Sequence, residues 1–139
     1  MRQLTLTIGL PRSGKSTWAR EQGCPIVNPD SIRLALHGQR FVLESEPMVW
    51  AIAEYMVRAL FLAGHEKVVL DACNTTEKRR DVWKKLCDKI QVEYAIVFIN
   101  TKPSVCIQRA EAAGDFEIIP VIRRMANETD IDCLKEAAK

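Results

Sequence analysis

A short run near the start of the chain, residues 9–17, has the residue types needed to hold a phosphate chain. It reads Gly-Leu-Pro-Arg-Ser-Gly-Lys-Ser-Thr and matches the pattern G-x-x-x-x-G-K-[ST]. Glycines at both ends let the backbone turn several N–H groups inward, with the positive end of a helix behind them. In such a loop Lys15 bridges the β- and γ-phosphates of a nucleotide and the Ser16 hydroxyl is a ligand of Mg²⁺. The pattern therefore predicts a site for Mg²⁺ and ATP or a similar nucleotide, with contacts from Gly9, Arg12, Ser13, Gly14, Lys15, Ser16 and Thr17.

A carboxylate after a later apolar run suits the metal side of such a site. Residues 67–72 contain Val-Val-Leu followed by Asp71, as expected for a central parallel strand that is covered on both faces. Asp71 would meet Mg²⁺ directly or hold a water molecule bound to it. Alone, such an Asp is equally well explained as the cap of the next turn. Because the phosphate-loop pattern is also present, we interpret Asp71 as a metal ligand.

Asp30 and Arg33 follow a second, shorter apolar segment and are three residues apart. This spacing places both side chains on one face of a helix, at the sheet edge where α/β proteins bind ligands. A carboxylate there can accept the proton of an attacking hydroxyl group, and a guanidinium can hold a phosphate through paired hydrogen bonds. The plainer interpretation is that Asp30 caps the helix after Pro29 and that Arg33 is a solvated surface charge.

Strands and helices must alternate along the chain to position these residues. Periodicity and breakers predict strands at 4–10, 25–28, 67–72 and 94–99, and helices at 14–21, 31–37, 47–63, after Thr75 or Thr76, at 101–113 and from 120 onward. A polar stretch, 39–46, separates the second and third helices. This order implies βαβ units and right-handed crossovers. The predicted fold class is α/β: a three-layer αβα P-loop NTPase fold with a short parallel sheet of about four strands.

Some side chains in these elements have expected positions of their own. In the longest helix the predicted inward residues are Val49, Ile52, Ala53, Met56, Ala59, Leu60 and Ala63. Trp18, Trp50 and Trp83 are each expected in the core. The basic run Lys78-Arg79-Arg80, together with Lys84 and Lys85, could follow a nucleic-acid backbone, but the solvated side of an amphipathic helix is the favoured interpretation.

Length and composition describe an ordinary globular protein. The chain has 139 residues, which predicts a single domain over 1–139, with 47% hydrophobic and 27% charged residues and a formal charge of +2. This charge does not indicate a nucleic-acid surface and does not exclude one. The five cysteines show no pairing pattern and are expected to be buried, reduced thiols. No membrane segment and no secretory leader is predicted, so a cytoplasmic location is expected, and the oligomeric state is open.

Beyond the loop pattern, residues 4–80 resemble the kinase domain of phage-type 5′-polynucleotide kinases. The resemblance is carried by Thr7-Ile8-Gly9 with Pro11, by Ser13-Gly14-Lys15-Ser16-Thr17-Trp18-Ala19-Arg20-Glu21, by Asn28-Pro29-Asp30-Ser31-Ile32-Arg33 as an N-x-D-x-x-R segment, and by Asp71 with Asn74 and Glu77-Lys78-Arg79-Arg80. It implies that Asp30 is the general base for the acceptor hydroxyl and that Arg33 holds the acceptor's phosphate. It also implies an ATP-dependent phosphotransferase whose acceptor is a polynucleotide 5′-hydroxyl.

One departure from this family concerns the lid arginine that neutralises the transferring phosphoryl group. The family places it just before a glycine, where this chain has Ala113 and then Gly114. Arg109, one turn earlier, is the expected substitute, with Arg123 and Arg124 as alternatives. Two other functions stay open: a kinase of small hydroxyl-bearing metabolites, and a nucleotide-binding switch without kinase activity. The pairing of Asp30 with Arg33 argues against a switch, which needs no acceptor base.

Overall fold

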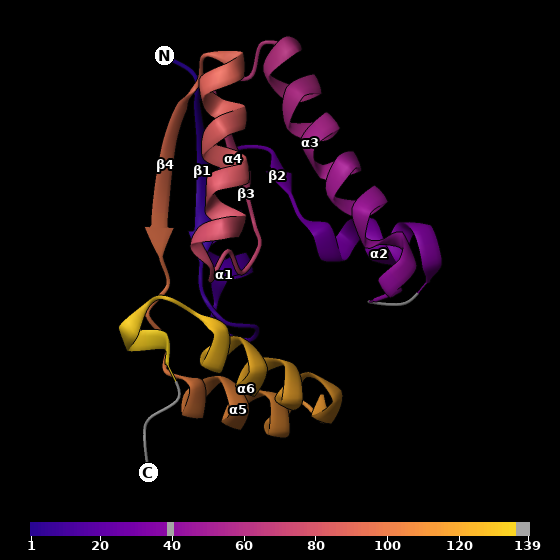
Figure 1. Ribbon diagram of the computed structural model, residues 1–139, viewed down its shortest axis with the longest axis vertical. Helices are drawn as coiled ribbons and strands as arrows, with labels where there is room; N and C mark the ends of the chain where they lie inside the picture. The colour runs from indigo at the N-terminus through magenta and orange to yellow at the C-terminus, as the bar shows by residue number, and fades with distance from the viewer. Residues whose placement is uncertain (39–40, 136–139) are drawn as a thin grey trace.

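The computed structural model describes residues 1–38 and 41–135, in which strands and helices alternate as predicted (Figure 1). The strands are β1 (Gln3–Ile8), β2 (Ile26–Val27), β3 (Lys67–Leu70) and β4 (Glu93–Phe98). The α-helices are α1 (Lys15–Glu21), α2 (Pro29–His37), α3 (Glu46–Leu62), α4 (Glu77–Ile90), α5 (Pro103–Ala112) and α6 (Ile119–Glu128). Of the predicted polar stretch, residues 39–40 lie outside the described residues, and Glu46 is already the first residue of α3.

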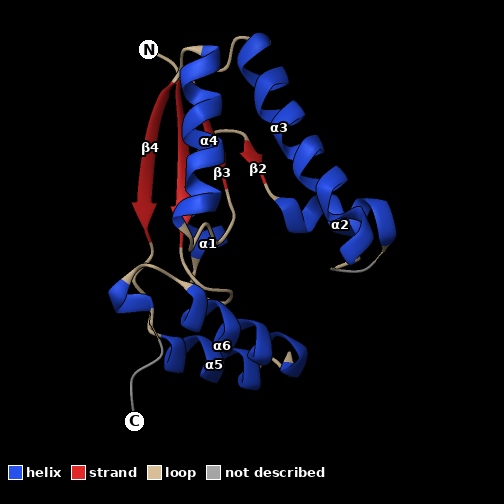
Figure 2. Ribbon diagram, viewed as in Figure 1, coloured by secondary structure: helices blue, strands red, loops and turns tan. Residues whose placement is uncertain are grey.

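All four strands are parallel and lie in the order β2-β3-β1-β4 (Figure 2). β1 and β3 therefore have a neighbouring strand on each side, which explains why Val68, Val69 and Leu70 are all buried. The carboxyl ends of parallel strands meet at one edge of the sheet. The loops that leave β1, β2 and β3 at this edge carry the phosphate-loop residues 9–17, Asp30 and Asp71.

Helices cover the sheet on both faces. Figure 1 shows α4 in front of the strands and the short α1 behind them. The larger apolar core joins α3 and α4 to one face of the sheet through Leu4, Leu6, Val68, Leu70, Val57, Trp83 and Leu86. This is the three-layer αβα P-loop fold predicted from the sequence.

Helices α5 and α6 form a separate pair beyond the carboxyl ends of the strands (Figure 1). Their buried residues Cys106, Ala110 and Ile122 share a second core with Ile8 and Leu10, at the point where β1 enters the phosphate loop. The pair is thus anchored next to the loop that it would cover. Within residues 1–38 and 41–135, no helix combines the length and apolar character needed to cross a membrane.

The buried stripe of α3 differs from the predicted one. Val49, Ala53, Val57 and Phe61 are buried at four-residue spacing, whereas Met56 is 38% exposed. The helix is apolar almost all round, so its periodicity defines no single face. The prediction was correct for Val49 and Ala53, which are buried, and partly correct for Ile52 and Leu60, which are half-buried. It was wrong for the exposed Met56, Ala59 and Ala63, and it missed Val57 and Phe61.

Candidate functional site

The phosphate loop has a tightly curled backbone between β1 and α1. Gly14 has φ +103° at the N-cap of α1, and Arg12, with φ +67°, also adopts a left-handed conformation that non-glycine residues rarely take. The Lys15 Nζ atom donates a hydrogen bond to the Leu10 carbonyl at 2.9 Å, so the ammonium group arches back over the loop. The Ser13 hydroxyl is buried and has no hydrogen-bond partner among the described residues. The loop therefore concentrates donors around a space suited to phosphate oxygens.

Gly9 is required by close approach within this loop. A Cβ atom at Gly9 would lie 2.7 Å from Ser13 Oγ and 3.2 Å from both the Ile99 carbonyl oxygen and Lys15 Cγ. We expect Gly9→Ala to displace Ser13 and Lys15 and to weaken ATP binding by at least about tenfold, the effect of losing one charged hydrogen bond. Isothermal titration with ATP would measure this loss. Gly23→Ala is the matched control, since Gly23 has φ +69° but open space around it, and its ATP affinity should be unchanged.

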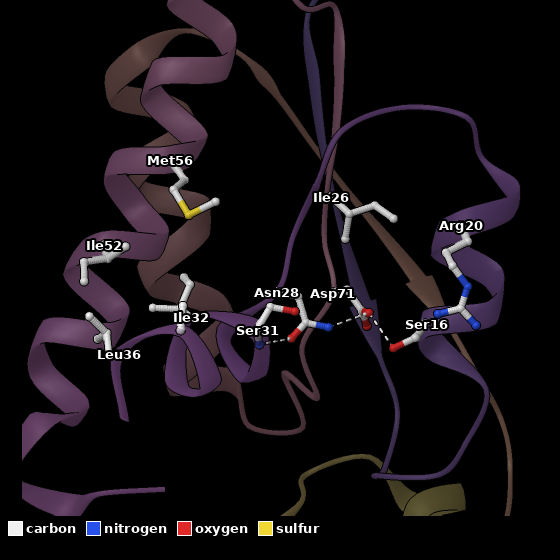
Figure 3. A pocket seen from close by; sticks show the side chains of 11 residues that line it. Ser16, Arg20, Ile26, Asn28, Ser31, Ile32, Leu36, Ile52, Met56 and Asp71 are labelled. Carbon is white, nitrogen blue, oxygen red and sulfur yellow. Dashed lines mark hydrogen bonds between the residues drawn. The ribbon is translucent and has the colours of Figure 1, made fainter. Parts of the chain in front are cut away.

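The predicted metal ligands lie in contact with each other. Ser16 Oγ donates a hydrogen bond of 2.6 Å to Asp71 Oδ2, and Asn28 Nδ2 donates to the same oxygen at 3.1 Å (Figure 3). Asp71 is only 3% exposed, and its position after β3 brings it beside the start of α1. A hydroxyl and a carboxylate are hard oxygen ligands of the kind that Mg²⁺ prefers. The described residues contain no group of three His, Cys, Asp or Glu side chains that could hold a metal, so an ion here would need further oxygens from phosphates and water.

Asn28 caps helix α2 and leaves the Asp30 side chain available. Asn28 Oδ1 accepts hydrogen bonds from the backbone N–H groups of Asp30 at 2.8 Å and Ser31 at 3.2 Å. The interpretation of Asp30 as a helix cap is therefore wrong. The Asp30 side chain is 69% exposed and contacts Arg33, whose Nη1 atom donates to it at 2.7 Å.

Arg33 is a partly buried, ion-paired residue and not a solvated surface charge. Its Nε and Nη2 atoms donate to the two carboxylate oxygens of Glu46 at 2.9 and 2.6 Å, and its side chain is 14% exposed. Burial by itself would lower the pKa of Arg33, but the hydrogen bonds to Glu46 and Asp30 outweigh burial and raise it. This bidentate pair fixes the guanidinium plane and turns its remaining edge toward Asp30.

The Cys73 thiol lies within electrostatic range of three charged residues of the candidate site. Burial raises the pKa of this thiol, the Lys15 ammonium opposes that rise, and the Asp30 and Asp71 carboxylates add to it. The backbone supports the same arrangement, because the Gly9 N–H donates to the Cys73 carbonyl at 3.0 Å. All five cysteines are free thiols, as expected, but only Cys87 and Cys106 are buried, so the expected burial is wrong for Cys24, Cys73 and Cys133.

Helix α5 contacts the phosphate loop through the predicted lid arginine. Arg109 Nη1 donates to the Arg12 carbonyl at 3.1 Å and lies 4.0 Å from the position of a Cβ atom built at Gly14. Arg12 in turn forms an ion pair of 3.0 Å with Asp115, which follows α5. Arg123 and Arg124 are exposed on α6, and Thr17 is exposed on α1. Among the three candidate lid arginines, Arg109 is thus the one with a hydrogen bond to the loop in the described structure.

Only part of the basic run at the start of α4 faces solvent. Lys78 is exposed, but the Arg79 guanidinium lies 3.7 Å from the ring centroid of Trp50. Arg80 donates to the Asn74 carbonyl and pairs with Asp130. The favoured interpretation of this run is therefore correct for Lys78, Lys84 and Lys85, which are exposed, and wrong for Arg79 and Arg80. Of the three tryptophans expected in the core, Trp83 is buried, whereas Trp18 and Trp50 are half-buried.

A pocket of 520 Å³ lies beside the Ser16–Asp71 pair (Figure 3). The apolar part of its lining comes from β2, α2 and α3, with Ile26, Ile32, Ala35, Leu36, Ile52 and Met56, and Arg20 and Asn28 add polar groups. Ser31 also lines it, but Asp30 and Arg33 do not, because they point from the opposite face of α2. The pocket therefore lies on one side of α2, and the Asp30–Arg33 pair lies on the other side.

The comparison with protein families agrees with this geometry. The family model described as an AAA domain, AAA_33, matches residues 4–115, which include the phosphate loop, Asp30, Asp71 and Arg109. The chain belongs to this AAA-domain family. The sequence of this chain matches no curated protein.

Solved structures share the fold of this AAA domain at low sequence identity. A chain of the Pnkp1/Rnl/Hen1 RNA repair complex is 19% identical over 93% of this domain, with a TM-score of 0.70. The *Mycobacterium tuberculosis* APS kinase CysC in complex with AMPPNP and APS is 20% identical, with coverage of 99% here and 84% there and a TM-score of 0.62. A gluconokinase from *Sinorhizobium meliloti* is 21% identical, with coverage of 98% and 78% and a TM-score of 0.56. The AAA domain spans only 46% of the chain from the RNA repair complex. These structures confirm the prediction that this chain has the fold of P-loop kinases.

The sequence analysis did not predict two contacts that lie around the Asp30–Arg33 pair. Glu46, which orients Arg33, stands in a segment that was predicted to be polar and irregular, and no local pattern links it to a residue on another helix. The contact between Trp50 and Arg79 joins α3 to α4, which the sequence separates widely. Only the order of the strands, which brings the N-termini of α2, α3 and α4 to one edge, creates these contacts.

Proposed function

We propose that this AAA domain is an ATP-dependent kinase that transfers the γ-phosphate to a hydroxyl acceptor, with a polynucleotide 5′-hydroxyl as the first candidate. The observation that carries the proposal is the chain of hydrogen bonds from Ser16 through Asp71 to Asn28, the residue that caps the helix bearing Asp30. This link supports a carboxylate that can accept a proton near a loop that can hold a phosphate chain. A domain that only binds nucleotide would need the loop but not Asp30.

On the nucleotide side, the backbone of residues 9–17 and the Ser13 hydroxyl are proposed to hold the phosphates of ATP. Lys15 would exchange its bond to the Leu10 carbonyl for the β- and γ-phosphate oxygens, and Ser16 and Asp71 would hold Mg²⁺. The ion, when bound, neutralises charge on the transferring phosphoryl group. Arg109 adds a positive charge from the lid side, where Ala113 replaces the arginine of the resembling family.

On the acceptor side, Asp30 accepts the proton of the attacking hydroxyl group while Arg33 orients the acceptor. The Glu46 pair holds two guanidinium nitrogens of Arg33, so a phosphate that binds Nη1 would displace the Asp30 carboxylate without releasing Arg33. Displacement frees Asp30 to meet the hydroxyl. Acceptor binding would then switch on the base, which favours transfer to the acceptor over transfer to water.

The acceptor class is tested with wild-type protein, Mg²⁺ and γ-labelled ATP against three acceptors: a 5′-hydroxyl oligonucleotide, a nucleoside 3′-monophosphate and gluconate. We expect label on the oligonucleotide, because the RNA repair complex is among the fold neighbours. Label on gluconate alone would favour the second candidate, a small-metabolite kinase, which the gluconokinase and APS kinase neighbours support. A protein that binds ATP but labels no hydroxyl compound would contradict the proposed kinase.

A further inference from the structure

Arg79 is a cation in the acceptor region without a carboxylate partner. Its guanidinium lies over the Trp50 ring, yet its side chain forms no hydrogen bond or ion pair in the described structure, residues 1–38 and 41–135. The carboxylate nearest to it electrostatically, Glu46, gives both oxygens to Arg33. A half-buried guanidinium has five N–H donors and retains its charge at any physiological pH. Stacking on an indole satisfies its flat face but none of these donors.

Trp50 brings Arg79 and Arg33 to one place. The Arg33 guanidinium carbon lies 5.8 Å from the same ring centroid that Arg79 covers at 3.7 Å. Burial lowers the pKa of Arg79, Glu46 opposes this, and the like charge of Arg33 lowers it further. Two arginines held this close repel each other unless an anion lies between or beside them. The carboxylates of Asp30 and Glu46 balance the two guanidinium charges, but their oxygens bond Arg33 and leave the side-chain N–H donors of Arg79 unused within the described residues.

We infer that Arg79, stacked on Trp50, is a binding residue for a phosphate group of the acceptor, so that the substrates of this domain carry a phosphate beside the reacting hydroxyl. The inference rests on the proposed function and narrows it. Unphosphorylated sugars and sugar acids are poor substrates, whereas a nucleic-acid end and a phosphorylated metabolite both meet the requirement. Arg79 suits this role because its guanidinium lies over the Trp50 ring and its side-chain N–H donors form no hydrogen bond within the described residues, so they can bind phosphate oxygens.

The test compares wild type with Arg79→Gln on matched acceptors that differ by one phosphate: a nucleoside, its 3′-monophosphate and a 5′-hydroxyl trinucleotide. Arg79→Gln should raise KM for the two phosphate-bearing acceptors by on the order of tenfold to a hundredfold, the effect of one charge-assisted bond. kcat and KM for ATP should change little. Arg79→Lys should fall between the two proteins, since it keeps the charge but loses the planar donor edge.

Lys78→Gln is the matched control, because it removes the same charge from the neighbouring, exposed position of α4. Its KM values should equal those of wild type. Melting temperatures of all variants separate a lost contact from a damaged fold. If Arg79→Gln and Lys78→Gln change KM equally, or if wild type accepts the nucleoside as readily as its 3′-monophosphate, the inference is wrong.

A binding measurement keeps this inference separate from the proposed function. The trinucleotide is titrated against tryptophan fluorescence, with and without Arg79→Gln, and requires no turnover. Tenfold or greater loss of affinity in the variant, with a salt dependence that is shallower by about one counterion, supports the phosphate contact even if no acceptor is phosphorylated. Equal affinity of both proteins overturns the contact, even if transfer to a hydroxyl is observed.

Discussion

Replacing Asp30 by Asn is expected to lower the rate of phosphoryl transfer by on the order of a hundredfold to ten-thousandfold, the usual contribution of a general base. Asparagine has nearly the same shape and can still accept the hydrogen bond from Arg33, but it cannot accept a proton. Because Asn28 and not Asp30 caps α2, the helix should be unaffected. The exposed Asp30–Arg33 pair adds at most about 1 kcal/mol to stability. Single-turnover transfer rates, with ATP affinity measured by titration, would show a loss of rate at unchanged affinity.

Asp88→Asn is the control for this experiment, since it removes the same charge from an exposed position on α4. It should transfer phosphate at the wild-type rate. An Asp30→Asn protein that keeps its full rate would show that Asp30 is not the base. A variant that loses ATP affinity as well would show that Asp30 belongs to the nucleotide site.

Replacing Lys15 by Met should give the second large effect, and it should act on the nucleotide. Methionine keeps most of the apolar stem of the side chain but removes the ammonium group that arches over the loop. We expect transfer to fall by on the order of a hundredfold to a thousandfold, as for loss of one preorganised charged donor. Affinity should fall more for ATP than for ADP, because Lys15 is proposed to contact the γ-phosphate.

Titration calorimetry with both nucleotides measures this difference. Lys84→Met, at an exposed position of α4, serves as control and should bind both nucleotides like wild type. Equal losses of ATP and ADP affinity in Lys15→Met would place the ammonium group away from the γ-phosphate. Unchanged affinity for both nucleotides would show that the phosphate loop does not bind them.

Local patterns in the sequence were sufficient to predict the sheet and the phosphate loop. Strand β3 is a continuous apolar run ending in Asp71, and Gly9, Gly14, Lys15 and Ser16 stand at fixed spacings between β1 and α1. Each signal is contained within a few neighbouring residues. The contact between Ser16 and Asp71 then follows from strand order, because adjacent parallel strands end at the same edge.

The surroundings of Asp30 and Arg33 could be predicted only in part. Asp30 and Arg33 were recognised by their spacing, but the partners that hold Arg33 and Arg79 come from α3. The buried face of α3 was itself ambiguous, since apolar residues occur all around the helix and Val57 and Phe61 are buried in place of Met56. Without the correct rotation of α3, the sequence could not show that Glu46 and Trp50 face the site.

The contact of Arg109, the proposed lid residue, with the phosphate loop could not be predicted from residue spacing. Arg109 is recognisable as a basic residue on α5, but its bond to the Arg12 carbonyl depends on how the α5–α6 pair is anchored on Ile8 and Leu10. The unusual φ of Arg12 and its ion pair with Asp115 are likewise properties of the folded loop.

The central claim is that γ-phosphate held by the loop is passed to a hydroxyl group positioned by Asp30. It is tested most directly by following the label of γ-labelled ATP in a single turnover with a saturating phosphate-bearing acceptor. The account predicts that most of the label appears on the acceptor hydroxyl and little as free phosphate, and that Asp30→Asn removes the acceptor product. Label that appears only as inorganic phosphate, at the same rate with and without acceptor, would contradict it.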